Sequence, residues 1–384
     1  MSNGWTSKPL GQIVTLQRGF DLPKRLRVDG EVPIISSSGP EDWHNEPIKI
    51  GPGLVTGRYG TIGKVFFVDG PYWPLNTTLF VSNFHGNDPR FCYYLLQRFD
   101  FAGQSGKTGV PGVNRNDLHA IEVFSPDNLP EQQAIAAALS DADGVVAGLE
   151  RVIAKKRLIK QGAMQDLLTA RRRLPGFSGE WEVKRLGDHV RFLKNGTHSR
   201  AQLYEHGPVK NLHYGDIHGA ASIFLSPATK PMPTLDLLSA GRLDRLAAGD
   251  LVFVDASEDL AGVGTSVEIT DLGSTEVVSG LHTIAARFDK SVLVDGFKAF
   301  LQFMPAFRSH LCQLAAGTKV LATNRRHISS AEIALPRPDE QQAIAKVLSD
   351  MDSEIQTLES RLAKARAVKE GMMQNLLTGR VRLV

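Results

Sequence analysis

Three stretches of the chain carry residue types that can do chemistry. GQSGKT, from Gly103, has the lysine and hydroxyl of a phosphate-binding loop, and GRYGTIG, from Gly57, has three closely spaced glycines. NLHYGDIHG places His213, Asp216 and His218 close together, and histidine and aspartate both bind metal ions. The spacing of the residues decides whether any of these stretches is a site.

That spacing argues against a catalytic or cofactor site. A phosphate-binding loop needs a glycine five residues before its last glycine, and this chain has Phe101 there. The second stretch lacks the spacing of a dinucleotide fingerprint and favours turns between strands. Two histidines and one carboxylate on a Gly-containing stretch favour a polar turn. No Ser/His/Asp or Cys/His set is evident. The sequence therefore predicts a protein with no catalytic residues, no metal site and no cofactor of its own.

Recognition of nucleic acid fits the polar residues better. Basic, amide and aromatic side chains gather in apparent loops, where Arg and Lys can pair with guanine or phosphate and Asn with adenine. In the first part of the chain the candidate DNA-binding residues are Arg18, Lys24, Arg25, Arg58, Tyr59 and Lys64. In the second part they are Lys194, Asn195, Thr197, His198, Arg200, Tyr214, Lys319, Asn324 and Arg325. The net charge of +3 does not by itself indicate such a role.

An internal sequence repeat indicates the architecture that must position these residues. EQQAIAAALSDADGVVAGLE, from Glu131, returns as EQQAIAKVLSDMDSEIQTLE, from Glu340, and the echo continues ungapped to the end of the chain. A Trp-x4-Leu-Gly opening at Trp5 recurs at Trp181. The offset is too long for a solenoid, so the repeat indicates a duplicated half-protein.

The repeated blocks have the periodicity of long helices. Apolar residues alternate at spacings of four and three, which is a heptad seam. The seam residues are Ile135, Leu139, Val146, Leu149 and Ile153 in the first copy, and Ile344, Leu348, Ile355, Leu358 and Leu362 in the second. Pro175-Gly176 predicts that the first helix stops after Arg173, while Gly162 and Gly371 are possible bends. Each helix could reach about 40 residues. We expect the apolar seam of each helix to pack against the seam of the other copy, in an antiparallel coiled coil.

The blocks before each helix have a different residue pattern. Short β-rich runs such as GLVTGRYGTIGKVFFVDG and GDLVFVDASEDLAGVGTSVEI are broken by Gly, Pro, Asn and Asp. We therefore predict α/β (α+β) recognition domains in two copies, separated by two long helices in an antiparallel coiled coil with an internal pseudo-two-fold. The predicted segments are 1–128, 129–174, 175–337 and 338–384. Helical spacing is also present around 89–98 and 294–304.

Composition limits the remaining classes. Hydrophobic residues make up 42% of the chain, yet no apolar run approaches the roughly 18 residues that span a bilayer. The N-terminus lacks the apolar stretch of a signal peptide, so a cytoplasmic location without a membrane partner is expected. Cys92 and Cys312 match no metal spacing and are expected to be reduced, half-buried side chains.

With variable blocks alternating with EQQ-initiated helices, the chain resembles the specificity subunits of type I restriction-modification systems. The resemblance covers essentially the whole chain, with YGDI at Tyr214 as softer support. It implies that each variable block is a target recognition domain that reads one half of a bipartite, asymmetric site in double-stranded DNA. The helices would set the spacing and dock two methyltransferase subunits, which restriction (translocase and nuclease) subunits then join. The implied subunit is non-catalytic, and S-adenosylmethionine, ATP and Mg²⁺ are expected on its partners.

Two other classes stay open on the residues alone. One is a coiled-coil adaptor whose two β-rich heads bind proteins or carbohydrates, and the other is an enzyme with an unrecognised site in one head. Binding to DNA through several phosphates must weaken steeply with salt, whereas a largely apolar protein contact need not. The enzyme predicts turnover by the isolated chain.

Overall fold

The computed structural model describes residues 4–101, 112–315, 317 and 320–383, and it forms two compact units. Met1–Val152 and Leu358–Val384 make the first unit, and Ile153–Thr357 makes the second. Each unit contains one β-rich head and part of both long helices. Within the described ranges, no helix has the length and apolar character needed to cross a membrane.

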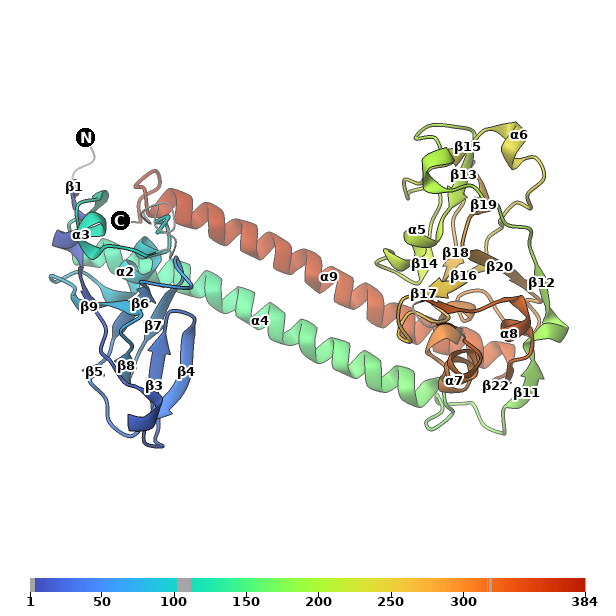
Figure 1. Cartoon of the computed structure of the whole chain (residues 1–384), viewed down its shortest axis with the longest axis horizontal. Coiled ribbons are helices and arrows are strands. Elements are labelled where there is room, and N and C mark those ends of the chain that lie inside the picture. The colour runs from blue at the N-terminus through green and yellow to red at the C-terminus, as the bar shows by residue number, and fades with distance from the viewer. Residues whose placement is uncertain (1–3, 102–111, 316, 318–319, 384) are drawn as a thin grey trace. The chain divides into compact units, whose positions relative to one another are not determined.

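The first head, residues 5–126, is built on two four-stranded sheets with orders β2-β9-β6-β7 and β4-β3-β8-β5 (Figure 1). A separate antiparallel pair, β1 with β10, joins its two ends. The strands are β1 Trp5–Pro9, β2 Thr15–Arg18, β3 Val32–Ser36, β4 Gly39–His44, β5 Lys49–Ile50, β6 Gly53–Gly57, β7 Val65–Val68, β8 Pro71–Pro74, β9 Thr78–Asn83 and β10 Glu122–Pro126. The helices are α1 Leu10–Ile13, η1 Lys24–Leu26, α2 Pro89–Leu96 and α3 Arg115–His119.

The second head, residues 182–335, has a five-stranded sheet of order β12-β20-β16-β18-β14, a three-stranded sheet of order β15-β13-β19, and the pairs β11-β22 and β17-β21. Its strands are β11 Glu182–Arg185, β12 Val190–Phe192, β13 Val209–Leu212, β14 Phe224–Leu225, β15 Thr234–Leu235, β16 Leu251–Val254, β17 Ala256–Ser257, β18 Ser266–Ile269, β19 Glu276–Ser279, β20 Thr283–Phe288, β21 Leu321–Ala322 and β22 Glu332–Leu335. Its helices are η2 Leu186–His189, η3 Arg200–Gln202, α5 Tyr214–His218, α6 Leu237–Ala240, η4 Lys298–Phe303, α7 Pro305–Leu314 and α8 Arg325–Ser329.

Both heads follow one chain path. In each, the first strand pairs antiparallel with the last, as β1 does with β10 and β11 with β22. The antiparallel order β2-β9-β6-β7 corresponds to β12-β20-β16-β18, and β14 adds a fifth strand to the second version. The parallel pair β3-β8 likewise corresponds to β13-β19. The two heads therefore share the same strand order and pairing, and equivalent positions in this shared frame can be compared.

Two long helices, α4 Leu129–Leu167 and α9 Pro338–Leu376, connect and follow the heads. Each has 39 residues, and neither Gly162 nor Gly371 interrupts it. The prediction that the first helix extends to Arg173 is wrong, because the helix ends at Leu167 and the chain turns at Ala170, whose φ is +56°. The equivalent residue of the second copy is Gly379, with a φ of +70°.

Within each unit the two helices pack antiparallel, as predicted. In the first unit Glu150 pairs with Arg366 at 2.5 Å, and Asp143 pairs with Lys369 at 2.5 Å. In the second unit Lys156 pairs with Glu354 at 2.7 Å, and Lys160 pairs with Asp352. In both units the partner's number falls as the number in α4 rises. These pairs are partly exposed and each contributes at most about 1 kcal/mol, so they mark the register more than they stabilise it.

The predicted seam positions lie on the inward faces of the helices. Ile135, Leu139, Ile153, Ile344, Leu348 and Ile355 are buried, and Val146, Leu149, Leu358 and Leu362 are partly buried. The first two residues of each set also belong to the core of the adjoining head, so the beginning of each helix serves both contacts. Met372 and Met373, near the end of α9, pack against the core of the first head.

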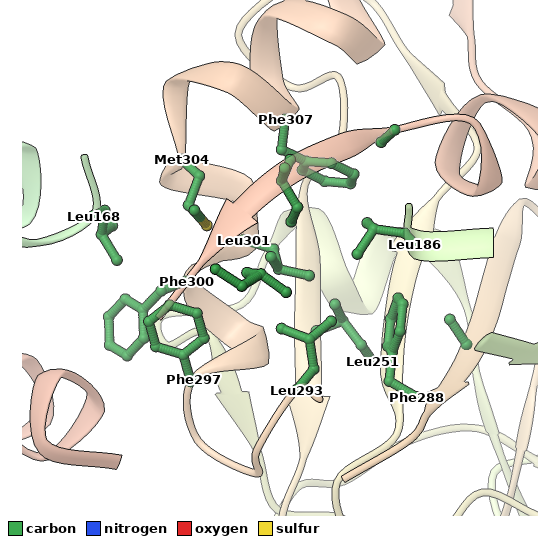
Figure 2. Packing of buried hydrophobic residues seen from close by; sticks show 14 of the residues in the cluster. Leu168, Leu186, Leu251, Phe288, Leu293, Phe297, Phe300, Leu301, Met304 and Phe307 are labelled. Carbon is green, nitrogen blue, oxygen red and sulfur yellow. The ribbon is translucent and has the colours of Figure 1, made fainter. Parts of the chain in front are cut away.

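The core of the second unit shows how a helix end is held. Figure 2 shows Phe297, Phe300 and Leu301, from the segment around η4, in one buried cluster with Leu251 and Phe288 of the five-stranded sheet. Leu167 and Leu168 at the end of α4 belong to the same cluster, as do Ile344 and Leu348 in α9. Burial of several such side chains, each worth about 1.5–3 kcal/mol, fixes both helices to this head.

A buried ion pair ties the start of each long helix to the tail that follows the other. In the first unit, the guanidinium of Arg382 donates two hydrogen bonds to the buried carboxylate of Glu131, one of them at 2.7 Å, and Trp5 Nε1 donates a third at 3.1 Å. In the second unit, Arg173 donates two hydrogen bonds to the buried Glu340, one to each carboxylate oxygen. The EQQ motif therefore acts as a structural clamp in both copies.

The glutamine that follows each glutamate extends the clamp into the head. Gln132 donates to Pro126 O at 2.9 Å and accepts from the backbone N–H of Asp88 at 2.8 Å. Gln341 donates to Pro336 O at 2.9 Å and accepts from the N–H of Val294 at 3.0 Å. These bonds satisfy backbone groups that burial would otherwise leave without partners.

The shorter predicted elements are partly confirmed. The β-rich runs form the hairpins β6-β7 and β16-β18, and α2 begins at Pro89 as expected. The helical spacing at 294–304 gives the 3₁₀ helix η4, followed by the α-helix α7. Both cysteines are free, but Cys92 is fully buried, because α2 turns it into the core of the first head.

Candidate nucleic-acid interface

Three of the predicted DNA-binding residues meet in one pocket of the first head. Arg18 ends β2, and Arg58 and Tyr59 directly follow β6. With Asn114 and Arg115, at the start of α3, they line a pocket of about 480 Å³. The backbone fixes this arrangement, since Val113 N–H donates to Arg58 O at 3.0 Å and Arg58 N–H donates to Thr77 O at 2.9 Å.

The pocket of the first head is cationic. The Arg58 guanidinium lies over the ring of Tyr59, with Cζ 4.6 Å from the centroid, and Tyr59 is 40% exposed. Arg18 has a distant partner in Asp21 at 3.7 Å, with over half of its side chain exposed. No acidic side chain is among the described residues that line this pocket. Three guanidiniums on one small surface favour an anion or a group rich in hydrogen-bond acceptors.

The other predicted residues of the first head lie outside the pocket. Lys24 and Arg25 are exposed in η1, and Lys64 is exposed just before β7. Their neighbour Arg27 is bonded to Asp42 at 2.8 Å and to Glu41 at 3.0 Å, and the Asp42 hydrogen bond raises the pKa of Arg27. These cations can attract a polyanion to the surface without forming part of the pocket.

The second head has a pocket at the equivalent place. Thr323 N–H donates to Asp255 O at 2.8 Å, and Asp255 N–H donates to His282 O at 3.2 Å, which matches the pattern of Val113, Arg58 and Thr77 in the first head. The pocket has a volume of about 750 Å³. Its described lining residues are Tyr214, His218, Ala256, Ser257, Glu258, Asp259, Ala261, Gly262, His282 and Val320. The turn after the strand thus carries acidic residues where the first head carries Arg58 and Tyr59.

An aromatic cluster forms one wall of the second pocket. Tyr214 is 39% exposed, and its ring centroid lies 4.5 Å from that of His213, 6.3 Å from that of His218 and 5.6 Å from that of His282. Burial lowers the pKa of His213. His282 adopts a left-handed backbone with a φ of +58° and contacts Asp255 Oδ1 through Nδ1 at 3.1 Å. Such a conformation is uncommon outside glycine and often occurs at functional sites.

The remaining predicted residues of the second head form other contacts. Arg325 donates to Leu193 O at 2.7 Å and to Asn195 Oδ1 at 3.1 Å, and Arg200 pairs with Asp216 at 3.1 Å. Asn324 caps α8 by accepting from the His327 N–H. Lys194 and Thr197 are exposed, and His198 is partly buried. Lys319 lies outside the described residues, as does the whole GQSGKT stretch.

Sequence reasoning missed several lining residues. Asn114 and Arg115 belong to NRNDL, whose echo NRRHI at Asn324 was visible in the sequence. Glu258 and Asp259 had no such signal, because the equivalence of β6 and β16 depends on strand pairing. Asp216 lies between His213 and His218 but bonds the His213 N–H and Arg200. Among the described residues, no three His, Cys, Asp or Glu side chains are grouped to hold a metal ion.

Residues 2–156 match the family model described as a type I restriction modification DNA specificity domain. The chain is therefore similar to type I restriction-modification specificity subunits. It is 24% identical over 313 residues to the type I restriction enzyme MjaVIII specificity subunit of Methanocaldococcus jannaschii, an alignment that covers 77% of this chain and 71% of that protein. A putative specificity subunit, MjaX, of the same organism is 24% identical over 347 residues, covering 84% of this chain and 76% of that protein.

Solved structures of specificity subunits have the same fold. The S subunit from M. genitalium aligns with a TM-score of 0.62 and 14% identity, covering 98% of this chain and 97% of that one. The HsdS subunit from Thermoanaerobacter tengcongensis aligns with a TM-score of 0.53 and 15% identity, covering 99% of this chain and 98% of that one. The predicted fold class, mixed α/β heads with two long helices, is confirmed.

Proposed function

We propose that this chain is the non-catalytic specificity subunit of a type I restriction-modification system and that its two heads each read one half of a bipartite, asymmetric site in double-stranded DNA. The observation that carries the proposal is the pair of pockets, which occupy one place in a shared frame but have different side chains. A duplicated frame provides two equivalent reading positions, and different linings provide two different half-sites. Arg, Asn, Tyr and Glu are residue types that contact bases and phosphates.

We further propose that the long helices set the gap between the half-sites and dock two methyltransferase subunits, which restriction subunits then join. S-adenosylmethionine, ATP and Mg²⁺ would be held by those partners. A solved relative of the same fold comes from a study of complex assembly in the type I system. An exposed apolar row on the part of α4 in the first unit supports docking there, because Val145 is 56% exposed and Val152, seven residues later, is 43% exposed. Residues seven apart lie on nearly the same face of a helix.

Placing a charge in this row is expected to weaken binding of the methyltransferase subunit. Val152→Asp removes apolar contact area and would bury an unpaired carboxylate in the interface, which costs roughly 2–4 kcal/mol, or about 30- to 1,000-fold in Kd. Val368→Asp, at an exposed position of α9 outside this row, is the matched control. The measurement is the Kd for the methyltransferase subunit by calorimetry. Equal affinities of both variants and the unaltered chain for the methyltransferase subunit would show that the row is not part of the interface.

The proposed function has a direct test. The chain is co-expressed with the methyltransferase subunit of its own system, and modified bases are mapped across the host genome by single-molecule sequencing. We expect one bipartite motif with a fixed gap. The purified complex should also bind that motif with a strong salt dependence, since neutralising six phosphates raises Kd roughly 10³-fold between 50 and 200 mM salt.

A carbohydrate- or protein-binding adaptor is the second candidate. It is favoured by the second pocket, which is lined by Tyr214 together with acidic side chains, because an aromatic ring and carboxylates can also bind sugars. This alternative predicts no new modified motif and no salt-sensitive binding of DNA by the complex. Both results together would favour the adaptor over the proposed function in DNA recognition.

A further inference from the structure

We propose that the two pockets read bases of opposite hydrogen-bonding character, with Arg58 donating to guanine in one half-site and Glu258 accepting from cytosine in the other. This inference rests on the proposed function and assigns a base to each pocket. It starts from one structural equivalence, namely that Arg58 directly follows β6 and Asp255 directly follows the corresponding strand β16. Glu258 lies three residues after Asp255, directly after the short strand β17. The same place in the frame therefore presents donors in one head and acceptors in the other.

In the first pocket, Arg58 is the side chain best prepared for a base edge. Its guanidinium is held over the Tyr59 ring, and it forms no hydrogen bond or ion pair with another described side chain. Stacking on an aromatic face orients the planar fork of N–H donors before a ligand arrives. Guanine presents two acceptors, O6 and N7, side by side in the major groove, and this is the edge that an arginine fork matches. Arg18 and Arg115 flank it and provide charge for neighbouring phosphates.

In the second pocket, neighbouring contacts single out Glu258. Asp255 contacts His282, and Asp259 Oδ1 accepts from the Gly262 N–H at 2.8 Å. Ser257 Oγ donates to Asp259 O at 2.7 Å, so the turn is fixed from within. Glu258 is exposed at the pocket and makes no hydrogen bond or ion pair with another described residue. The segment therefore presents the Glu258 carboxylate to the pocket that Tyr214, His218 and His282 also line.

The chemistry of a carboxylate decides what this pocket can read. Glu258 is an acceptor only, so it repels phosphate and the O6/N7 edge of guanine. The exocyclic N4 amino group of cytosine is the usual partner of Glu or Asp in the major groove. The partly exposed, apolar ring of Tyr214 can contact the base edge beside it. A cationic pocket and an anionic pocket at one place in the frame thus separate the two half-sites.

Methylation mapping of the complex tests both assignments with single substitutions. Arg58→Ala is expected to lower discrimination at one guanine of the first half-site by about 10- to 100-fold and to leave the second half-site unchanged. Glu258→Ala is expected to do the same at one cytosine of the second half-site. Glu258→Gln should shift that preference toward adenine, because an amide pairs with N6 and N7 of adenine. For each variant, the half-site that the unaltered head reads serves as an internal control. Glu180→Ala, which removes an exposed glutamate outside the pocket, is the control for loss of a surface carboxylate.

The outcomes separate this inference from the proposed function. A wild-type complex that modifies no motif and binds no DNA would remove the proposed function itself. A bipartite wild-type motif without a G·C pair in one half-site would overturn the assignment to that head. The assignment also fails if the variants keep the wild-type motif at every position, or if they relax both half-sites alike. If a variant loses all modification activity, its base preferences are measured instead by selecting binding sites from a random DNA library with the purified complex. The preference must then change at the same guanine or cytosine position.

Discussion

Arg382→Ala is expected to destabilise the first unit by about 3–5 kcal/mol, because it leaves a buried carboxylate without its cation. The side chain of Glu131 has no exposed surface and receives its hydrogen bonds from Arg382, Trp5 and Asn128. Truncation of the arginine also removes packing over the Trp5 ring, whose centroid lies 5.5 Å from the guanidinium. The change should appear as faster hydrogen exchange in peptides covering 129–152, read by mass spectrometry on the full chain.

The pH dependence of this variant has a defined sign. In the wild type, burial raises the pKa of Glu131, but hydrogen bonds from Arg382 and Trp5 offset it, and the pKa lies below the ordinary value of 4.5. The stability that Glu131 contributes is therefore present above pH 4.5 and is lost as the pH falls through its folded pKa. Without Arg382, burial dominates and the folded pKa rises above the unfolded one. The deficit of the variant should then shrink as the pH falls toward 4.5.

Two controls make the result specific. Arg380→Ala removes an exposed arginine two residues away and should change stability by less than about 0.5 kcal/mol. Arg173→Ala breaks the equivalent pair with Glu340, so its accelerated exchange should appear in peptides of the second unit. Equal exchange in the wild type and Arg382→Ala would show that the clamp contributes little to stability.

The sequence was sufficient for the features that local pattern determines. The long helices followed from a sustained heptad pattern and from the repeat, because apolar periodicity reports which face of a helix is buried. The end of α4 was misplaced at Pro175-Gly176, although the second copy held a better signal. Gly379 marks the left-handed turn that Ala170 makes in the first copy. The early turn is required because the segment after α4 must place Arg173 against Glu340.

The pockets depend on pairings that the sequence does not display. Arg58 and Arg115 meet because β6 pairs with β9 and because Val113 bonds the backbone of Arg58. Some predicted residues bond to other parts of the head, as Arg325 does with Leu193 and Asn195. Residue type alone cannot distinguish an arginine that holds a loop from one that faces a ligand, since both need the same donors. The acidic lining of the second pocket became visible only when the two frames were matched strand by strand.

Removal of seven residues from each long helix is expected to shorten the gap between half-sites by up to about three base pairs, with both half-sites unchanged. Seven residues of α-helix span about 10 Å, and one base pair of DNA occupies about 3.4 Å. Deletion of 145–151 from α4 and of 360–366 from α9 removes Glu150 together with its partner Arg366. It leaves the Asp143–Lys369 and Lys156–Glu354 pairs in place. A full heptad keeps the apolar seam on the same face of each helix.

The wild-type site should lose modification by at least about 100-fold in this variant, because a half-site that no longer reaches its head loses its base contacts, each worth about 1–3 kcal/mol. Genome-wide mapping of modified bases then reports the new gap directly. Deletion from α4 alone is the control, since it breaks the antiparallel register and should abolish modification at every gap. An altered half-site sequence, or an unaltered gap in the matched deletion, would show that the helices do not measure the distance. In that case the spacing must come from the partner subunits that hold the heads on DNA.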